Sequence, residues 1–335
     1  MLVPRPPIQV KGLKRGTTRS AAELHVSGGI RAVGAGDKRW SWLPALAEGR
    51  TVQLDPMPIN QIHALAESLD ETLFGGDQIS GLESSLVSRI WTPLDGPHAG
   101  GLQPADLWNG VAGNAEHAGD EKFGALARHF AFSLHAAGMR LRDASDHYHD
   151  QLLAAVGDKR QSGERFSNVP MRDLHLAFHS VLSELASARD YLAAAFAHKL
   201  GAPDKVDALN RLAEWLRAPS RKAKRSEAIV SDMLAAYDPE GDDPWLYELT
   251  EYRNRFLHRQ PMGASGVAPW LRYEETKRND LSFPRVELPI TDREGQSGMD
   301  ALKQFIALYR RMTTLSASAI QHAPYDSDLP HFVAD

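Results

Sequence analysis

The chain has 335 residues, of which 42% are hydrophobic and 24% are charged, and its formal net charge at pH 7 is −5. This balance is typical of a soluble globular protein and excludes a disordered chain or one embedded in a membrane. The net negative charge argues against a protein that coats nucleic acid over its whole surface, but it is compatible with a local basic patch. Because the sequence contains no cysteine, it excludes disulfides, thiolate catalysis and cysteine zinc sites.

The sequence gives no sign of a membrane partner. No apolar run approaches the roughly 20 residues that span a bilayer. The N-terminal segment is basic and broken by prolines, and it lacks the apolar core of a signal peptide. We therefore expect a cytoplasmic protein.

The first third of the chain has a mixed residue pattern, with short strand-like runs and one helical segment. Residues 1–58 are rich in Gly, Pro and Arg, and their short apolar runs suit strands or irregular coil better than helix. Between 59 and 74, four apolar residues recur at helical spacing: Ile62, Leu65, Leu69 and Leu73. Residues 93–118 are typical of a glycine- and proline-rich connection that holds one short helix. We expect residues 1–118 to form an N-terminal extension or small domain of mixed or irregular structure, with no role that we can assign.

Beyond residue 118 the pattern becomes helical. Long helices are predicted over 121–156 and 171–200, and shorter ones over 204–217 and 221–236. The second long helix ends at Gly201-Ala202-Pro203, which is typical stop chemistry. Another helix starts where Asp243 can cap it and Pro244 suits its first turn. The core-facing stripe of the second long helix comprises Leu174, Phe178, Val181, Leu185, Leu192 and Phe196.

After Pro261 the pattern changes to short extended runs at 270–273 and 285–288, which predict a hairpin packed on the helices. A last helix is predicted over 299–321. The sequence thus predicts a mainly α fold over 119–322, a helical bundle of about five helices with a small β insert. Residues 323–335 form a C-terminal tail.

The helix over 244–260 carries the most informative residues. At 100° per residue, Arg253 falls about 340° from Leu246, inside the apolar stripe that includes Leu249 and Phe256. Burial of an unpaired guanidinium is costly, so Arg253 should meet a carboxylate, a subunit boundary or an anionic ligand. Four polar residues share a neighbouring face of this helix: Tyr247, Glu251, Asn254 and His258.

These residue types suit cleavage of RNA without a metal or another cofactor. His258 lies in the last turn of the helix, where the carbonyl ends favour a protonated imidazole. A histidine that titrates near neutrality can act as base or acid when a ribose 2′-hydroxyl attacks the adjacent phosphate. Arg253 would stabilise the charge of the phosphorane-like transition state.

Spacing alone does not single out this pair. Four other pairs of arginine and histidine have four to six residues between them: Arg19 and His25, Arg128 and His135, Arg142 and His147, and Arg172 and His179. Short motifs of this kind recur by chance, and most such residues are ordinary surface groups. Only the pair in 244–260 combines an arginine in an apolar stripe, a following asparagine and a histidine at the end of the helix.

The segment Glu248-Leu-Thr-Glu-Tyr-Arg-Asn-Arg-Phe-Leu-His258 resembles the Arg-x4-6-His helix of the HEPN superfamily. The preceding long helix, with Ser187-Ala188-Arg189-Asp190-Tyr191-Leu192, is similar to the second helix of many members. The resemblance covers roughly residues 120–322 and implies a HEPN-like helical bundle that dimerises, so that two motifs share one cleft. The long insert before the motif helix departs from compact members.

The resemblance also implies a function. Many members are metal-independent endoribonucleases that serve as toxins, in phage defence or in RNA processing, and a cognate antitoxin would then be a partner. On this sequence Arg253 and His258 would be catalytic, and Asn254 would be a positioning residue within the site. Other members only bind RNA, a nucleotide or a protein, and such a non-catalytic module is the alternative.

Three other groups of residues have candidate roles. The segment 217–225 contains five basic residues, including Arg221, Lys222, Lys224 and Arg225, and could bind an RNA backbone. Its alternative is a solvated surface. Tyr247 and Glu251 of the 244–260 helix are further candidates for substrate binding. Possible metal ligands are dense at Asp143, Asp146, His147, His149 and Asp150, and His175 and His179 have the spacing of a helical metal pair. For both groups of possible ligands we favour a structural role, and we predict no metal site.

Overall fold

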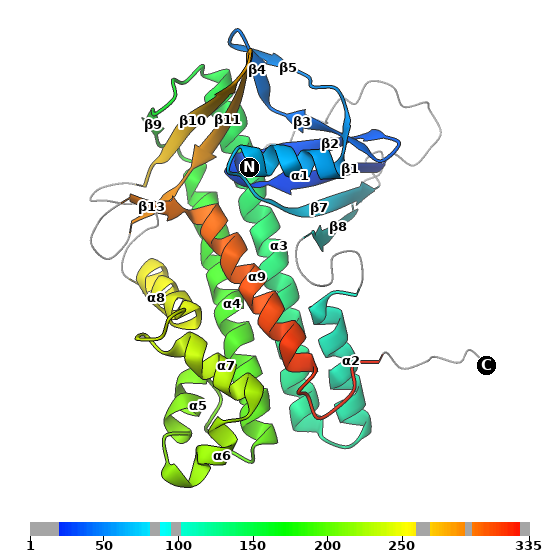
Figure 1. Ribbon diagram of the computed structural model, residues 1–335, viewed down its shortest axis with the longest axis vertical. Helices are drawn as coiled ribbons and strands as arrows, with labels where there is room; N and C mark the ends of the chain where they lie inside the picture. Colours follow the sequence, from blue (N-terminus) through cyan, green and yellow to red (C-terminus); the bar gives the residue numbers. More distant parts are fainter. Residues whose placement is uncertain (1–19, 81–87, 95–101, 259–268, 292–296, 329–335) are drawn as a thin grey trace, which may run out of the picture.

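The computed structural model describes residues 20–80, 88–94, 102–258, 269–291 and 297–328. Two antiparallel sheets stand at one end of the molecule and a body of helices extends from them (Figure 1). The expected mainly α bundle is therefore wrong: the fold is an α/β mix with sheets of six, five and two strands. The helices were predictable because helical periodicity is local, whereas each of the two larger sheets also pairs segments that lie far apart in the sequence, such as Leu46 with Ser282.

The six-stranded sheet is built from the N-terminal part of the chain and has the strand order β6-β3-β2-β1-β7-β8. Strand β1 lies near its centre and pairs with β2 and β7, so that Leu24 lies opposite Ala32 and Gly76. One face is partly covered by helix α1 (Ile59–Ser68) and the other faces helix α3 (Glu121–Gly157) (Figure 1). The strands are β1 (Ser20–Val26), β2 (Arg31–Gly36), β3 (Arg39–Leu43), β6 (Met57–Pro58), β7 (Leu73–Ser80) and β8 (Ser88–Pro93).

The five-stranded sheet joins the two ends of the chain, with the order β5-β4-β11-β10-β9. Leu46 of β4 pairs with Ser282 of β11, so the N-terminal part completes a sheet begun by the predicted C-terminal hairpin. The predicted boundary at 118 falls between helices α2 (Pro104–His117) and α3, and it stays a prediction. The strands are β4 (Ala45–Ala47), β5 (Arg50–Val52), β9 (Arg165–Phe166), β10 (Leu271–Arg278) and β11 (Leu281–Glu287); β12 (Pro289–Thr291) and β13 (Ser297–Asp300) form the two-stranded sheet.

The long helices lie close to where the apolar pattern predicts them. Helix α3 has 37 residues, about 55 Å, and it connects the sheets to the far end of the helical body (Figure 1). The stripe predicted on α4 (Met171–Lys199) is fully buried, with Phe178 and Leu185 at 0% exposure. No helix in the described ranges has the length and apolar character needed to cross a membrane. The remaining helices are α2 (Pro104–His117), α5 (Leu209–Trp215), α6 (Lys222–Arg225), α7 (Ala228–Tyr237), α8 (Trp245–His258) and α9 (Ala301–Ile320).

Buried charges hold the six-stranded sheet against α3. Arg31 of β2 and Arg89 of β8 approach the two oxygens of Asp146 on α3 at 3.1 and 2.6 Å. Arg89 also binds Asp77 of β7. Burial opposes ionisation of Asp146, but the hydrogen bond from Arg89 and the two guanidinium charges hold its pKa well below the usual range. Removing one partner would leave a buried charge uncompensated, so this network fixes the sheet on α3.

A tight turn lets the sheet meet α3 and the C-terminal hairpin at one point. The turn η1 (Ser27–Gly29) follows β1, and Gly28 and Gly29 have φ of +72° and +83°. A Cβ on Gly28 would lie 2.8 Å from Cβ of Arg285 in β11, and one on Gly29 would lie 2.5 Å from the carbonyl oxygen of Tyr148 in α3. Glycine is therefore required at Gly29 both for its backbone conformation and for its contact with α3.

We predict that Gly29→Ala lowers the free energy of unfolding by about 3 kcal/mol, because overpacking at Tyr148 adds to the cost of the left-handed backbone. Gly119→Ala is the matched control: Gly119 has φ of +84°, and nothing lies within 4 Å of the added Cβ. It should cost about 1 kcal/mol. Urea unfolding of both variants measures the difference, and equal losses would show that the contact with α3 does not constrain the turn.

Candidate functional site

Helix α8, which carries the predicted motif, is anchored on α4 and α9 by its apolar stripe. Leu246 and Leu249 are completely buried. Nη1 of Arg189 in α4 donates a hydrogen bond to Oγ1 of Thr250. Tyr252 stacks on Phe256 with ring centroids 5.8 Å apart, and it meets Phe305 of α9 edge-on at 6.4 Å. The backbone of α8 is thus held in a fixed place along the helical body.

Arg253 lies beside this stripe without becoming fully buried. Its side chain is partly exposed, and no hydrogen bond or ion pair joins it to another residue in the described part of the chain. Asn254 is also partly exposed. His258 is the last residue of α8, and its side chain lies outside what the structure describes. The expected carboxylate partner of Arg253 is therefore not found among the described residues.

The predicted companions Tyr247 and Glu251 lie on the same side of α8 as Asn254, about 100° to 140° from Leu246. Tyr247 is partly buried against Tyr237 of α7, with ring centroids 6.3 Å apart. Glu251 is partly exposed. This places Tyr247 about three turns and Glu251 about two turns before the end of α8, on its polar face.

His179 of α4 lies beside the end of α8, and His175 lies one turn away from it on α4. Helices α4 and α8 are antiparallel, because Arg189 meets Thr250 while His179 meets the backbone of Phe256. Burial lowers the pKa of His179, although the Phe256 backbone acts in the opposite direction. Burial and the neighbouring His179 lower the pKa of His175. The four-residue spacing was the only sequence signal for this pair, and spacing could not show that it faces α8.

The basic segment is not brought to the end of α8. Arg221 donates to the carbonyl oxygen of Trp215 and lies over its ring, and Lys224 donates to the carbonyl oxygen of Leu200. Only Lys222 and Arg225 of the four predicted residues are exposed. Helix α6 lies at the end of the helical body farthest from the sheets (Figure 1). Two of the four basic residues therefore cap helices in this chain.

Several of the residues considered as possible metal ligands bind other side chains or backbone groups instead. Asp146 binds Arg31 and Arg89, and Nδ1 of His149 lies 2.7 Å from the carbonyl oxygen of Gly29. Asp143 pairs with Arg140 and Arg142. Within the described ranges, no three His, Cys, Asp or Glu side chains are grouped so as to hold a metal ion. The clustering of these residues is explained by their contacts with the sheet and along α3.

A serine, a histidine and an aspartate are aligned behind the six-stranded sheet. Nδ1 of His25 lies 3.2 Å from Oγ of Ser145, and Nε2 lies 3.4 Å from Oδ2 of Asp77. The order resembles that of a nucleophile, its base and an orienting carboxylate. His25 and Ser145 are completely buried, and Arg31 donates to Oγ of the serine. Since the hydroxyl is closed to a substrate, we assign this group to the structural charge network.

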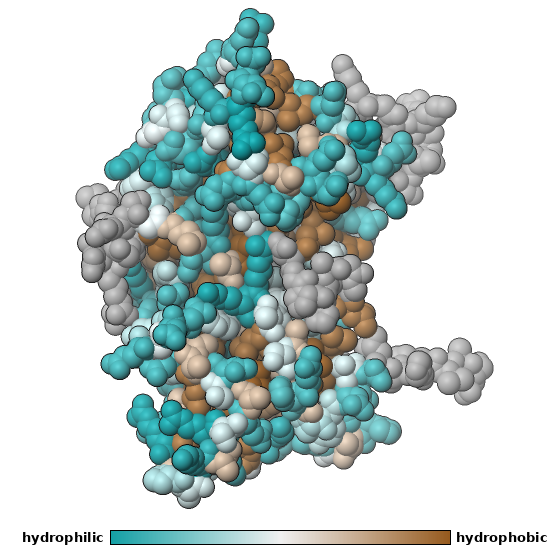
Figure 2. All heavy atoms as spheres, viewed as in Figure 1, coloured by the Kyte–Doolittle hydropathy of each residue, from teal (hydrophilic) through white to brown (hydrophobic). Residues whose placement is uncertain are grey.

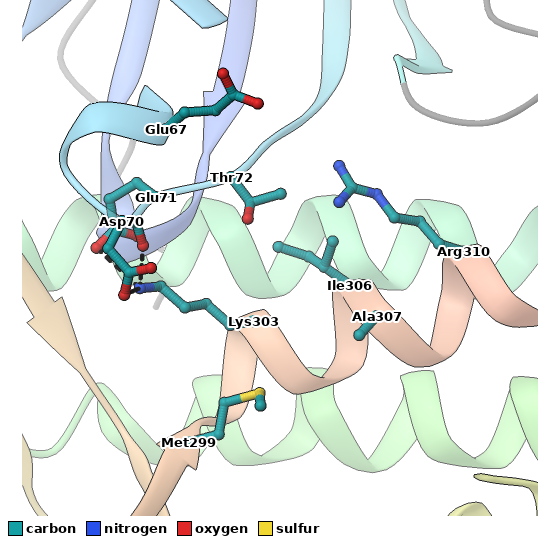
Figure 3. A pocket seen from close by; sticks show the side chains of 9 residues that line it. All are labelled: Glu67, Asp70, Glu71, Thr72, Met299, Lys303, Ile306, Ala307 and Arg310. Atoms are coloured by element: carbon teal, nitrogen blue, oxygen red, sulfur yellow. Dashed lines mark hydrogen bonds and ion pairs between the residues drawn. The ribbon is translucent and has the colours of Figure 1, made fainter. Parts of the chain in front are cut away.

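A pocket that the sequence did not predict lies where α1 meets α9. Its volume is about 390 Å³, and Figure 3 shows side chains from the end of α1 and the following turn facing side chains of α9. Lys303 of α9 points toward the acidic turn, where its Nζ lies 3.2 Å from Oδ2 of Asp70 and 3.3 Å from Oε1 of Glu71. Ile306 and Ala307 form an apolar wall along α9. The pocket therefore has an acidic side, a lysine that neutralises part of it and an apolar side.

Glu71 is the most perturbed acid of this pocket. Burial raises its pKa to about 7, although the charge of Lys303 and a hydrogen bond from Ser27 act in the opposite direction. Its side chain is 1% exposed and also lies 3.4 Å from Nε of Arg285. No local pattern around Glu71 indicates burial, because its contacts come from β11, α9 and the η1 turn.

Comparison of the chain with protein-family models, with curated proteins and with solved structures finds no match. The resemblance of the α8 segment to the HEPN helix therefore stays a prediction. Functional inference rests on the residues and their geometry.

We predict that the free-energy contribution of Glu71 depends on pH. Its raised pKa means that the folded state binds the proton more tightly than the unfolded chain, so this stabilisation is present below about pH 4 and is lost as pH rises through 7. The free energy of unfolding of the wild type minus that of Glu71→Gln should fall by about 2.5 kcal/mol between pH 5 and pH 8. Glu67→Gln, at an exposed position of the same pocket, is the control. A constant difference for Glu71→Gln would contradict the raised pKa.

Proposed function

We propose that the protein is a metal-independent endoribonuclease that acts in the cytoplasm and cleaves RNA at the end of α8. The single observation that supports this most is Arg253, a guanidinium on a well-anchored helix with no carboxylate partner among the described residues. A guanidinium beside an apolar stripe is stabilised by an anion, and its planar donors suit phosphate.

The proposed chemistry needs one acceptor and one donor of protons. His258 removes the proton of a ribose 2′-hydroxyl, a bond forms between O2′ and phosphorus, and the bond from phosphorus to O5′ breaks. The protonated His258 then gives its proton to O5′, which leaves a 2′,3′-cyclic phosphate and a 5′-hydroxyl. Arg253 stabilises the negative charge of the transition state. Asn254 positions the phosphate, and Tyr247 and Glu251 contact the neighbouring nucleotides.

The helix geometry favours a site shared by two copies of the chain. Positions 253 and 258 are five residues apart, so they lie about 140° apart around α8. The two positions thus lie on different sides of one helix, whereas two copies of α8 facing each other would bring position 253 of one near position 258 of the other. We therefore propose a homodimer as the active form.

We predict that the purified protein cleaves single-stranded RNA in the presence of a metal chelator. Arg253→Ala and His258→Ala should each lower the cleavage rate at least about 100-fold, the typical loss when a group that stabilises the transition state is removed. Arg255→Ala is the matched control, since Arg255 lies two residues away on the other side of α8 and over the ring of Phe256. It should change the rate less than about threefold.

Two outcomes would exclude catalysis at α8. Unchanged cleavage by both Arg253→Ala and His258→Ala would place the activity elsewhere. RNA binding without cleavage, weakened by Arg253→Ala and unaffected by His258→Ala, would instead establish a non-catalytic RNA-binding module at the same helix.

A further inference from the structure

A second cavity lies on the face of the six-stranded sheet that α1 only partly covers. Its volume is about 440 Å³, within the range of small-molecule sites. Ile59, the first residue of α1, stands at its rim and is 42% exposed. The cavity thus begins where the cover provided by α1 ends. The charge network of Arg31, Arg89 and Asp146 lies on the opposite face of the sheet, which faces α3.

The floor of this cavity is flat because three adjacent strands place small residues there. Gly34 of β2, Ala22 of β1 and Gly76 of β7 line it. A Cβ on Gly76 would lie 3.3 Å from Cδ2 of Leu24, and one on Gly34 would lie 3.8 Å from Cζ3 of Trp40. Trp40 pairs with Gly34 in the sheet, so its indole stands beside the floor. The space suits a flat molecule lying against the sheet and the indole.

The polar groups around the floor are uncharged amide, hydroxyl and indole groups. Gln78 of β7 and Thr92 of β8 line the cavity, one strand apart. Neither their side chains nor the indole N–H of Trp40 makes a hydrogen bond to another residue of the described ranges. An amide both donates and accepts, as the edge of a nucleobase does. Glu23 and Asp77, which also border the cavity, are engaged with Arg31 and Arg89 on the face toward α3.

We propose that this cavity binds a nucleobase, which lies on the small-residue floor beside Trp40 while Gln78 and Thr92 contact its polar edge. Three features support this ligand over others: a flat apolar floor, an aromatic wall and hydrogen-bonding groups without formal charge. Stacking on an aromatic side chain is the general way in which proteins hold unpaired bases. The base can belong to a free nucleoside or to a single strand, and both have the same chemistry.

The site is independent of the cleavage proposed at α8. It lies on the sheet at the other side of α3 and shares no residue with α8. Binding can therefore be measured with ligands that have no cleavable phosphodiester next to a 2′-hydroxyl, and the outcome does not depend on whether the protein cuts RNA.

Isothermal titration of the full chain with adenosine, guanosine, cytidine and uridine tests the proposal. We expect saturable binding of at least one nucleoside with a Kd below about 1 mM. Gln78→Ala and Thr92→Val should each weaken it about fivefold, the effect of one lost hydrogen bond. Ile90→Ala is the matched control, because Ile90 pairs with Gln78 on the neighbouring strand, is 57% exposed and does not line the cavity.

A single-stranded oligodeoxynucleotide distinguishes the two sources of the base, because it lacks the 2′-hydroxyl needed for cleavage. Competition with the bound nucleoside would identify a base within a strand as the ligand, and absence of competition would identify a free nucleoside. If no nucleoside binds, or if Gln78→Ala and Thr92→Val bind as tightly as Ile90→Ala, the proposal is wrong.

Discussion

The close contact between the Ser27–Gly29 turn and α3 is the constraint on which the arrangement of sheets and helices depends. At this turn β1 ends, α3 passes within contact distance of Gly29, and β11 approaches Gly28. The hydroxyl of Ser27 donates to Glu71, and that carboxyl in turn lies near Lys303 of α9. Four elements that are distant in sequence therefore meet where two residues without side chains leave room for them.

The buried charges act at the same interface. Arg31 and Arg89 neutralise Asp146 and Asp77, and the depressed pKa of Asp146 shows that its ionised form is strongly favoured there. Charged pairs in an interior contribute little net stability compared with apolar packing, but they penalise any arrangement that separates them. The network therefore specifies how the sheet is oriented on α3 more than it adds to stability. The face of the molecule drawn in Figure 2 is mostly hydrophilic.

The sequence predicted the helices and the hairpin of β10 and β11, but it did not predict how the strands assemble into the larger sheets, for a physical reason. The stripe on α4, with Leu174 and Val181, repeats every three or four residues and can be recognised within one segment. The pairing of Leu46 with Ser282 depends on residues 236 positions apart, and nothing near either residue indicates it. For the candidate site, the periodicity placed Arg253 inside the apolar stripe of α8, whereas in the structure its side chain is partly exposed. Glu71 and the cavity beside Trp40 depend on contacts between strands and helices, so no local pattern could indicate them.

The chemical identity of the RNA ends tests the central claim most directly. A defined single-stranded RNA would be incubated with the wild-type protein in the presence of a chelator, and the fragments would be analysed by mass spectrometry. Attack by the 2′-hydroxyl, with Arg253 and His258 at the phosphate, predicts fragments with 2′,3′-cyclic phosphate and 5′-hydroxyl ends. Fragments with 3′-hydroxyl and 5′-phosphate ends, or intact RNA, would contradict the account.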